Sequence, residues 1–204
     1  MKKLFITGKG RCNITNAGDM DNLFANVMTN AKFLYSAFYS YDNQRVIAFF
    51  ERNGLRTKTE RGNRVFPVSD HSSDVIATLQ KVLKEKKVKV MLHTQVQSLL
   101  MESSGEDAPE NIVTGVKLTD GTTMPADAVI IATGGFSYQT TGSTGDGYRF
   151  AKEAGHTVTD IRPSLVPFLA KEDYVRQMQG LSLKNVEVRI LNEKKLLYQE
   201  FGEM

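Results

Sequence analysis

The sequence predicts an α/β fold, in which amphipathic helices accompany an antiparallel β-meander and one buried strand that ends in glycines. Three observations lead to this prediction. Apolar residues recur at helical spacing within residues 74–86. Residues 96–124 contain short apolar segments separated by turn residues, as a meander does. Ala128–Ala132 is a continuous apolar run, typical of buried parallel strands, and it runs directly into Thr133-Gly-Gly135.

Helical patterns cover four segments of the N-terminal half, namely residues 21–28, 32–39, 43–53 and 74–86. Gly54 follows the third segment as a C′ residue that ends a helix. Asp70, Ser72 and Ser73 are candidate caps for the fourth helix. The buried face of that helix is expected to carry Val75, Leu79, Val82 and Leu83.

The first expected strand lies within residues 1–8, an apolar segment that ends in glycine. Further strands are expected at residues 55–60, 88–92, 96–101 and 112–118, with a short one at Met124. The turns between them are expected at Arg61–Arg64, in a polar loop over residues 102–110, and at Asp120-Gly121. Past Pro163 the pattern becomes β-rich, and Val186–Ile190 alternates cleanly.

Composition excludes several classes of protein. The net charge is only +3, and 41% hydrophobic with 24% charged residues is ordinary for a soluble globular protein. The densest basic run, Lys81–Lys87, ends a helical pattern, so no nucleic-acid partner is expected. No apolar run reaches the roughly 18 residues of a membrane span, so no membrane partner is expected. With a single cysteine, Cys12, and three scattered histidines, we expect a cytoplasmic protein without a metal site.

The strongest chemical signal is the glycine-rich loop that follows Ala128–Ala132. Glycines allow a ligand to approach the backbone closely, and the N-terminus of the following helix offers N–H groups to an anion such as a pyrophosphate. The alternative is a surface loop of small residues capped by Asp146. The ligand-binding interpretation assigns six candidate cofactor contacts here: Thr133, Gly134, Gly135, Thr144, Gly145 and Asp146.

A second signal is the polar loop Gly8–Asn16, which is rich in hydrogen-bond donors. Such a loop suits the oxygen atoms of a large polar ligand, and its candidate contacts are Gly8, Gly10, Arg11, Asn13 and Asn16. The alternative is a loop whose side chains bond its own backbone, and the residues taken alone favour that alternative.

The remaining candidates have plain structural interpretations. Arg11 could lower the pKa of the neighbouring Cys12, but one cysteine cannot form a redox pair. Four aromatic residues could line a substrate pocket, although their helical spacing favours the core: Tyr35, Phe38, Tyr39 and Tyr41. No spacing identifies a catalytic residue, and the oligomeric state stays open.

Five segments, in this order and at fitting spacing, resemble one known family. They are Gly8-Lys-Gly-Arg-Cys-Asn-Ile-Thr-Asn16, Arg64-Val-Phe-Pro-Val-Ser69, Ala132-Thr-Gly-Gly135, Thr141-Gly-Ser-Thr-Gly-Asp-Gly147 and Pro163-Ser-Leu-Val-Pro167. Together they resemble the HI0933-like flavoproteins, also called the aminoacetone oxidase or BaiN-like family of NAD(P)/FAD-dependent oxidoreductases. The third and fourth segments are also similar to fumarate-reductase-type flavoproteins.

The resemblance implies a partial FAD-binding domain of the two-dinucleotide-binding, Rossmann-like type over residues 1–161. Residues 162–204 would begin an inserted β-barrel-like domain. The Gly8–Asn16 loop would lie near the flavin and ribityl chain, Val96 near the adenine, and the glycine-rich loop along the cofactor. The implied activity is hydride or electron transfer between a small organic substrate and FAD, with NAD(P)H or oxygen as partner.

One departure from the family matters. The Gly-x-Gly-x-x-Gly turn that would hold the FAD pyrophosphate does not occur in this sequence. The chain is therefore interpreted as an internal fragment that binds FAD weakly and is inactive by itself. The alternatives are a non-catalytic fragment that binds no flavin and acts as an interaction module, and a nucleotide-binding chain without redox chemistry.

Overall fold

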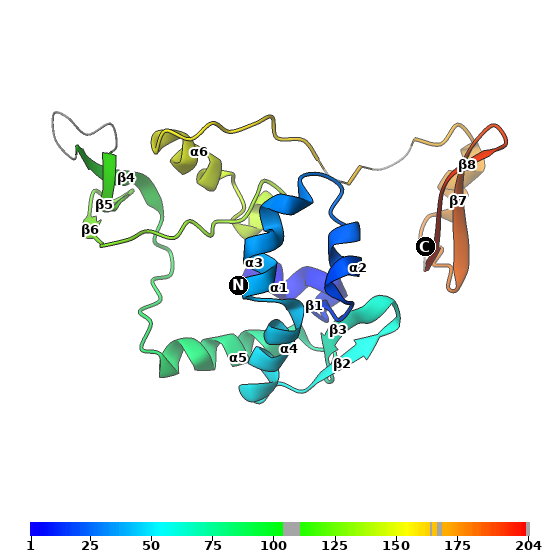
Figure 1. Ribbon diagram of the computed structural model, residues 1–204, viewed down its shortest axis with the longest axis horizontal. Helices are drawn as coiled ribbons and strands as arrows, with labels where there is room; N and C mark the ends of the chain where they lie inside the picture. Colours follow the sequence, from blue (N-terminus) through cyan, green and yellow to red (C-terminus); the bar gives the residue numbers. More distant parts are fainter. Residues whose placement is uncertain (104–110, 164, 167–168, 203–204) are drawn as a thin grey trace. The chain divides into compact units, whose positions relative to one another are not determined.

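The computed structural model describes residues 1–103, 111–163, 165–166 and 169–202 (Figure 1). It divides the chain into two compact units, Met1–Val158 and Thr159–Met204. The division falls close to the domain boundary expected after residue 161. The assignment of the two parts to an FAD domain and an inserted domain stays a prediction.

The first unit opens with helix α1 (Lys2–Ile6) and a 3-10 helix (Thr7–Gly10), where a strand was expected. The Phe5 amide donates to the Met1 carbonyl at 3.2 Å. Leu4 packs against the hydrophobic core of this unit. The strand prediction is wrong because the helical conformation places Leu4 on the core, and packing of an apolar face outweighs the weak β preference of the residues.

Three further helices follow, and they agree with the pattern of the sequence. They are α2 (Met20–Ala25), α3 (Tyr35–Ser40, after a 3-10 helix Ala31–Leu34) and α4 (Asn43–Arg52). Asp19 and Asp42 cap α2 and α4, because their carboxylates accept backbone N–H groups at 2.8 and 2.7 Å. Gly54, with φ of +93°, ends α4 as predicted.

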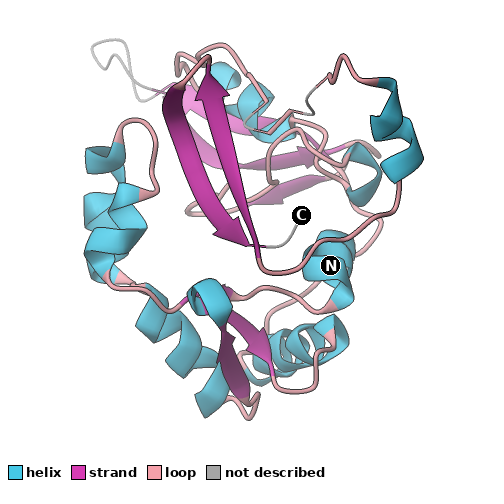
Figure 2. Ribbon diagram, turned by 90° about the vertical axis from the view of Figure 1, so that its right-hand side faces the viewer, coloured by secondary structure: helices cyan, strands magenta, loops and turns pink. Residues whose placement is uncertain are grey.

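A small antiparallel sheet with strand order β1–β3–β2 lies next in the first unit (Figure 2). Its strands are β1 (Thr15–Asn16), β2 (Thr57–Glu60) and β3 (Arg64–Pro67). The predicted hairpin turn joins β2 to β3 and contains Gly62 at φ of +73°. β1 is the end of the Gly8–Asn16 loop, so this loop is attached to the sheet through β3.

Helix α5 (Ser72–Glu85) completes the core beside this sheet. Val75, only 1% exposed, packs with Cys12, Phe50 and Leu55, and Leu79 joins the same cluster. Val75 and Leu79 of the predicted face are therefore confirmed, whereas Val82 and Leu83 are only half-buried. Burying a Val or Leu side chain contributes roughly 1.5–3 kcal/mol, which makes this cluster a main source of stability in the unit.

The predicted caps of α5 are wrong. His71 occupies the N-cap position and makes no side-chain capping bond. The Ser72 hydroxyl donates instead to the Phe5 carbonyl at 2.7 Å, and Asp70 forms ion pairs outside the helix. Ser73 bonds its neighbour Asp74 at 3.5 Å. The Ser72 hydroxyl and the Asp70 carboxylate therefore bind partners elsewhere in the fold instead of capping the N-terminus of α5.

The expected β-meander is present as a second antiparallel sheet. Its strands are β4 (Val96–Ser103), β5 (Asn111–Leu118) and β6 (Thr123–Pro125). The Asp120 carboxylate accepts the Thr122 N–H at 2.9 Å in the predicted turn between β5 and β6. Of the polar loop expected at 102–110, residues 104–110 lie outside the described residues. Helix α6 (Asp146–Glu153) contacts β4.

Two predicted strands, residues 88–92 and 128–132, are segments without strand pairing, and Leu92 lies in a turn. Ile130 is 91% exposed and Leu92 is 74% exposed, so neither segment is buried. A strand exists only where a neighbour satisfies its N–H and C=O groups. Among the described residues, no strand pairs with either segment. The apolar composition of Ala128–Ala132 was therefore not sufficient to make it a strand here.

The second unit contains an antiparallel hairpin of β7 (Val186–Asn192) and β8 (Lys195–Gly202), after a 3-10 helix (Asp173–Met178). The predicted alternating strand at Val186–Ile190 is confirmed. Val188 lies opposite Glu200 and Ile190 opposite Tyr198. None of the residues described in this unit is buried.

Candidate functional site

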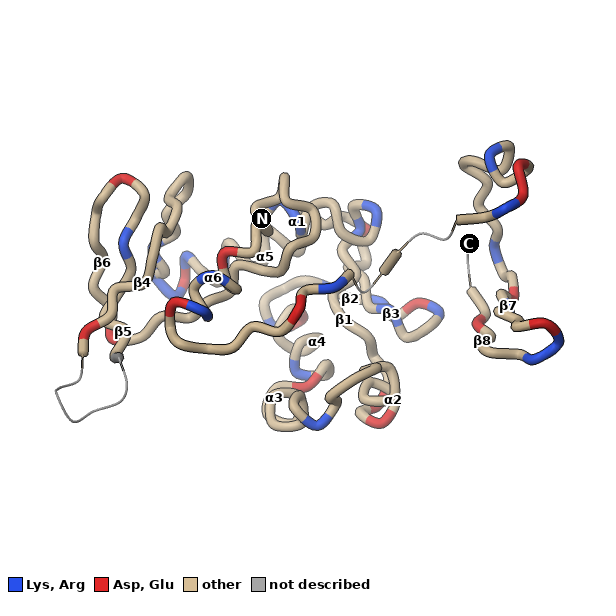
Figure 3. Tube along the Cα trace, turned by 90° about the horizontal axis from the view of Figure 1, so that it is seen from above, with Lys and Arg blue, Asp and Glu red and all other residues tan. Residues whose placement is uncertain are grey.

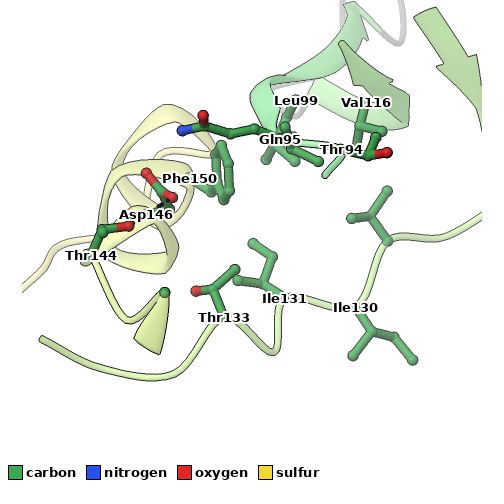
Figure 4. A pocket seen from close by; sticks show the side chains of 13 residues that line it. Thr94, Gln95, Leu99, Val116, Ile130, Ile131, Thr133, Thr144, Asp146 and Phe150 are labelled. Carbon is green, nitrogen blue, oxygen red and sulfur yellow. Dashed lines mark hydrogen bonds between the residues drawn. The ribbon is translucent and has the colours of Figure 1, made fainter. Parts of the chain in front are cut away.

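A cavity of about 510 Å³ lies within the first unit and is the strongest candidate for a binding site. β4, β5, the extended segment 129–133 and the start of α6 surround it (Figure 4). Its volume lies in the range of small-molecule sites. Four of the predicted cofactor contacts line it: Val96, Thr133, Thr144 and Asp146.

The cavity combines apolar walls with a few polar groups. Figure 4 shows Leu99 and Val116 on the sheet side, and Thr144, Asp146 and Phe150 on the helix side. Thr94 and Gln95, which precede β4, add polar atoms to the lining. Such a surface suits a flat, largely apolar ring that carries a small number of hydrogen-bonding groups.

The glycines of the loop are required by the packing beside this cavity. A Cβ on Gly145 would lie 2.5 Å from the Phe136 ring, and one on Gly134 would lie 2.9 Å from the Ser143 Oγ. Both residues also have positive φ, +83° and +76°. Gly135 is less constrained, since its Cβ would be 3.5 Å from the Tyr148 hydroxyl. Gly134 and Gly145 thus shape the loop, while contact of Gly134, Gly135 and Gly145 with a ligand stays a prediction.

The start of α6 differs from the anion site expected there. Gly145 is the N-cap and makes no side-chain cap, so Asp146 does not cap the helix in the way the alternative interpretation required. The Asp146 carboxylate accepts the Thr144 hydroxyl at 3.0 Å and Arg149 at 3.4 Å. A carboxylate at this position repels phosphate and accepts hydroxyl or N–H groups. This end of the cavity therefore suits a sugar hydroxyl or an amine better than a pyrophosphate.

The second predicted segment, Gly8–Asn16, contributes no lining residue to this cavity. A Cβ on Gly8 would lie 2.9 Å from the backbone nitrogen of Asn13. Gly8 and Gly10 have φ of +58° and +82°. The Asn16 side chain bonds Gly62 O at 2.9 Å and Gly18 N at 2.7 Å. With its amide oriented to donate, Asn13 reaches two backbone carbonyls. The loop therefore bonds its own surroundings, and its contact with a cofactor stays a prediction.

Arg11 is held in a network of four charged side chains. Its Nη2 lies 2.5 Å from Glu60 Oε1, and its Nε donates to Asp70 Oδ1 at 2.8 Å. Lys58 completes the network at 2.6 Å from Asp70 and 3.3 Å from Glu60. The guanidinium also lies 4.1 Å above the Phe66 ring. These contacts fasten the loop to the β2–β3 hairpin and leave the charge of Arg11 neutralised within the protein.

The network shifts the protonation equilibria of its acidic members. The hydrogen bond from Arg11 lowers the pKa of Glu60, with a further contribution from Lys58. The hydrogen bond from Lys58, followed by that from Arg11, lowers the pKa of Asp70. Both carboxylates are thereby kept ionised and paired at neutral pH.

Cys12 is a core residue. It is 3% exposed, and burial raises the pKa of its thiol. The neighbouring Arg11 turns toward Glu60 and Asp70, so the suggestion that Arg11 lowers the pKa of this thiol is wrong. A thiol with a raised pKa is a poor nucleophile, which agrees with a structural role.

The three tyrosines in and just after α3 form neither core nor cavity wall. Tyr35, Tyr39 and Tyr41 are 42%, 63% and 52% exposed. Tyr35, Phe38 and Tyr39 cluster around Phe24 of α2, with the Phe24 and Tyr35 rings 4.5 Å apart. The preference for a core role is therefore corrected, and none of the four lines the cavity.

Sequence reasoning missed the apolar walls of the cavity and its link to α1. Phe150 is 4% exposed, and the amphipathic pattern of α6 could have placed it inward. No pattern indicated Thr94 and Gln95. Lys3 donates to Ser137 O at 2.8 Å and to Ser143 Oγ at 2.5 Å, a connection that only the tertiary structure reveals.

The described part of the chain contains neither a metal-binding cluster nor a membrane-spanning helix. Within it, no three His, Cys, Asp or Glu side chains gather in a way that could hold a metal ion. None of its helices combines the length and apolar character that crossing a membrane requires.

Residues 1–204 match the model of the HI0933-like protein Rossmann domain. The chain belongs to the HI0933-like family. It is 30% identical over 203 residues to the 3-dehydro-bile acid delta(4,6)-reductase of Clostridium scindens, covering 100% of this chain and 46% of that protein. The predicted α/β, Rossmann-like fold class and the resemblance stated from the motifs are thereby confirmed.

Two ribosomal RNA dihydrouridine synthases are more distant relatives. That of Escherichia coli is 24% identical over 199 residues, covering 98% of this chain and 47% of the enzyme. That of Haemophilus influenzae is 26% identical over 185 residues, covering 89% of this chain and 44% of the enzyme. The chain thus spans less than half the length of these curated relatives.

Proposed function

We propose that this chain functions as part of an FAD-dependent oxidoreductase, which transfers hydride or electrons between a small organic substrate and FAD. The observation that carries the proposal is the cavity that gathers Val96, Thr133, Thr144 and Asp146 in a chain of the HI0933-like family. When bound, FAD would supply the redox chemistry, and the protein would supply binding and orientation.

The cavity fits part of such a cofactor. Its apolar walls would hold one face of a flat ring, with Val96 at the strand start proposed to lie near the adenine. Thr133, Thr144 and Asp146 would orient hydroxyl or amine groups. Among the described residues that line the cavity, none is Lys or Arg. Nothing there neutralises a pyrophosphate, which supports the expectation that this chain by itself binds FAD weakly.

The names of the relatives favour reduction of the substrate. One relative is a reductase, and the others are synthases of a dihydro compound, so both names describe the addition of hydrogen. We propose the same direction here, with NAD(P)H as electron donor and a small molecule as substrate. Figure 3 shows Lys and Arg interspersed with Asp and Glu along the chain, which supports a small-molecule substrate over a nucleic acid. A cytoplasmic location is part of this proposal.

The test is a titration of the isotope-labelled chain with FAD, followed by amide chemical shifts. We expect shifts centred on Val96, Thr133 and Thr144, with a dissociation constant above about 10 μM because several charge-assisted bonds to the pyrophosphate are missing. Absence of any shift at millimolar FAD would reject the flavin proposal and favour the interaction module. Stoichiometric submicromolar binding would show that the expectation of weak binding is wrong.

Two parallel titrations separate the remaining alternative. Riboflavin carries the flavin without the nucleotide, and AMP carries the nucleotide without the flavin. Shifts of the cavity amides with AMP and FAD, together with a flavin absorption spectrum that FAD binding leaves unchanged, would favour nucleotide binding without redox chemistry.

A further inference from the structure

Lys3 connects helix α1 to the glycine-rich loop, which is far away in the sequence and carries predicted site residues. Its ammonium group donates to Ser137 O at 2.8 Å and to Ser143 Oγ at 2.5 Å. Lys3 lies on α1, directly before the Gly8–Asn16 loop, while Ser137 and Ser143 belong to the glycine-rich loop. One side chain thus joins α1 to the glycine-rich loop.

The two acceptors lie at the two ends of residues 137–143, a short excursion of the glycine-rich loop. Between them lie a 3-10 helix, Gln139–Thr141, and two residues with positive φ, Tyr138 at +54° and Gly142 at +99°. Positive φ is unfavourable for a residue such as tyrosine, so this excursion requires support from its surroundings. A single ammonium that binds both ends closes the excursion and supplies that support.

The contact of Lys3 with the loop is linked to the cavity through Ser143. This residue is 5% exposed, and its Oγ lies 2.9 Å from the position of a Cβ on Gly134. Its chain neighbours Gly142 and Thr144 line the cavity, as does Thr133 beside Gly134. A displacement of Ser143 therefore moves the cavity wall at three points.

The helix that presents Lys3 is itself anchored. The Ser72 hydroxyl of α5 donates to the Phe5 carbonyl at 2.7 Å, and Ser72 is 2% exposed. Leu4 packs against the core cluster that contains Val75. The ammonium is thus supplied from a fixed support, as a positioning group requires.

We propose that Lys3 is a positioning residue that clamps the glycine-rich loop and so fixes the shape of the cavity beside it. The part of this proposal that concerns cofactor binding rests on the proposed function. In the Lys3→Met variant, the alkyl chain remains but Ser143 Oγ and Ser137 O lose a charged donor.

Amide hydrogen exchange tests the clamp whether or not the chain binds flavin. In Lys3→Met and in Ser143→Ala, we expect exchange of residues 137–145 to become at least tenfold faster, while the amides of α4 and α5 keep their rates. The double variant is expected to exchange no faster than Lys3→Met, because Lys3→Met already removes the contact with Ser143 Oγ that Ser143→Ala removes. Lys2→Met, at the exposed neighbouring position, is the control and should match the parent chain.

The FAD titration then tests the effect on the cavity. We expect Lys3→Met to weaken FAD binding at least threefold and Lys3→Arg to restore most of it, while Lys2→Met has no effect. Unchanged exchange in Lys3→Met, or fully additive effects in the double variant, would refute the clamp. Faster exchange with unchanged FAD affinity would refute the positioning role. A parent chain that binds no FAD would refute the proposed function, and the exchange rates would still decide on the clamp.

Discussion

At the scale of single residues, Arg11 shows how a charged side chain in a glycine-rich loop can serve the fold. Its guanidinium is paired with Glu60 and Asp70 and lies over Phe66. The side chains of Glu60 and Asp70 are 30% and 41% exposed, so solvent screens their attraction to Arg11. Four interacting charges, however, hold the loop more firmly than an isolated surface pair does.

This network predicts a dependence of stability on pH. The hydrogen bonds from Arg11 and Lys58 hold the pKa values of Glu60 and Asp70 in the folded chain below the ordinary values of these groups. A carboxylate with a lowered pKa stabilises the folded state above its unfolded pKa, and this contribution is lost as the pH falls through the folded pKa. Stability measured by urea unfolding should therefore begin to fall as the pH drops below about 5.

The Glu60→Gln variant should have a shallower slope of stability against pH in this range, because one of the linked groups is gone. The matched control is Glu85→Gln, whose carboxylate forms an exposed pair with Lys81 at 3.9 Å. Equal slopes for the parent chain and Glu60→Gln would contradict the network as the source of the dependence.

Two glycines with similar positive φ allow the cost of backbone strain to be measured apart from the cost of a steric contact. Gly145 has φ of +83° and its Cβ would meet the Phe136 ring at 2.5 Å, whereas Gly155 has φ of +87° and its Cβ would meet nothing within 4 Å. Gly155→Ala should cost about 1 kcal/mol from strain alone. Gly145→Ala should cost about 1–3 kcal/mol more, because the Phe136 ring must move. Urea unfolding of both variants measures the difference, and equal losses would show that the contact with Phe136 is unimportant.

At the scale of elements, Ala128–Ala132 departs furthest from its sequence pattern. It has the composition of a buried parallel strand, yet Ile130 and Ile131 are 91% and 42% exposed. The cavity uses the segment as a wall, since Val129, Ile130 and Ile131 line it. This segment therefore forms part of the candidate site without belonging to a sheet.

The exposure of Ile130 predicts tolerance to substitution. Ile130→Lys should change the free energy of unfolding by less than about 0.5 kcal/mol, as is usual for surface positions. The matched variant is Phe150→Ala, since Phe150 is 4% exposed and its loss should cost about 3 kcal/mol or more. A loss of several kcal/mol in Ile130→Lys would show that the segment is buried in the folded chain.

At the scale of the whole molecule, the chain buries less of its surface than compact units of the same mass do. It exposes 16,546 Å². Two separate compact units of these sizes would expose roughly 11,000 Å² together, by the usual scaling of surface with mass. Apolar side chains contribute to the difference, among them Ile130 in the first unit and Tyr198 in the second, 91% and 54% exposed. The apolar burial that stabilises the chain is therefore concentrated in a few side chains, among them Val65, Val75 and Phe150.

The two units should differ in resistance to proteolysis. The second unit consists largely of one hairpin, and isolated hairpins are marginally stable in water. Limited digestion should therefore remove parts of residues 159–202 first and leave a product that ends near Val158. Mass spectrometry of the products is the measurement. Early cleavage within α4 or α5 would contradict this order of stability.

The sequence by itself determined the family, the helices α4 and α5, the inward-facing Val75 and Leu79 of α5, and the β-meander. These features follow from local periodicity and turn residues, which the chain carries wherever it folds. The nine-residue loop motif and the glycine-rich loop identified the family correctly.

Only the tertiary structure decided which polar groups remain available and which apolar segments become strands. Arg11 and Ser72 found partners 49 or more residues away, so neither a ligand contact nor a helix cap could be inferred from their neighbours in sequence. Ala128–Ala132 needed a paired strand, and Lys3 needed acceptors more than 130 residues along the chain. Hydrogen bonds and ion pairs are short-ranged, so their partners are set by the approach of distant segments, which local sequence does not record.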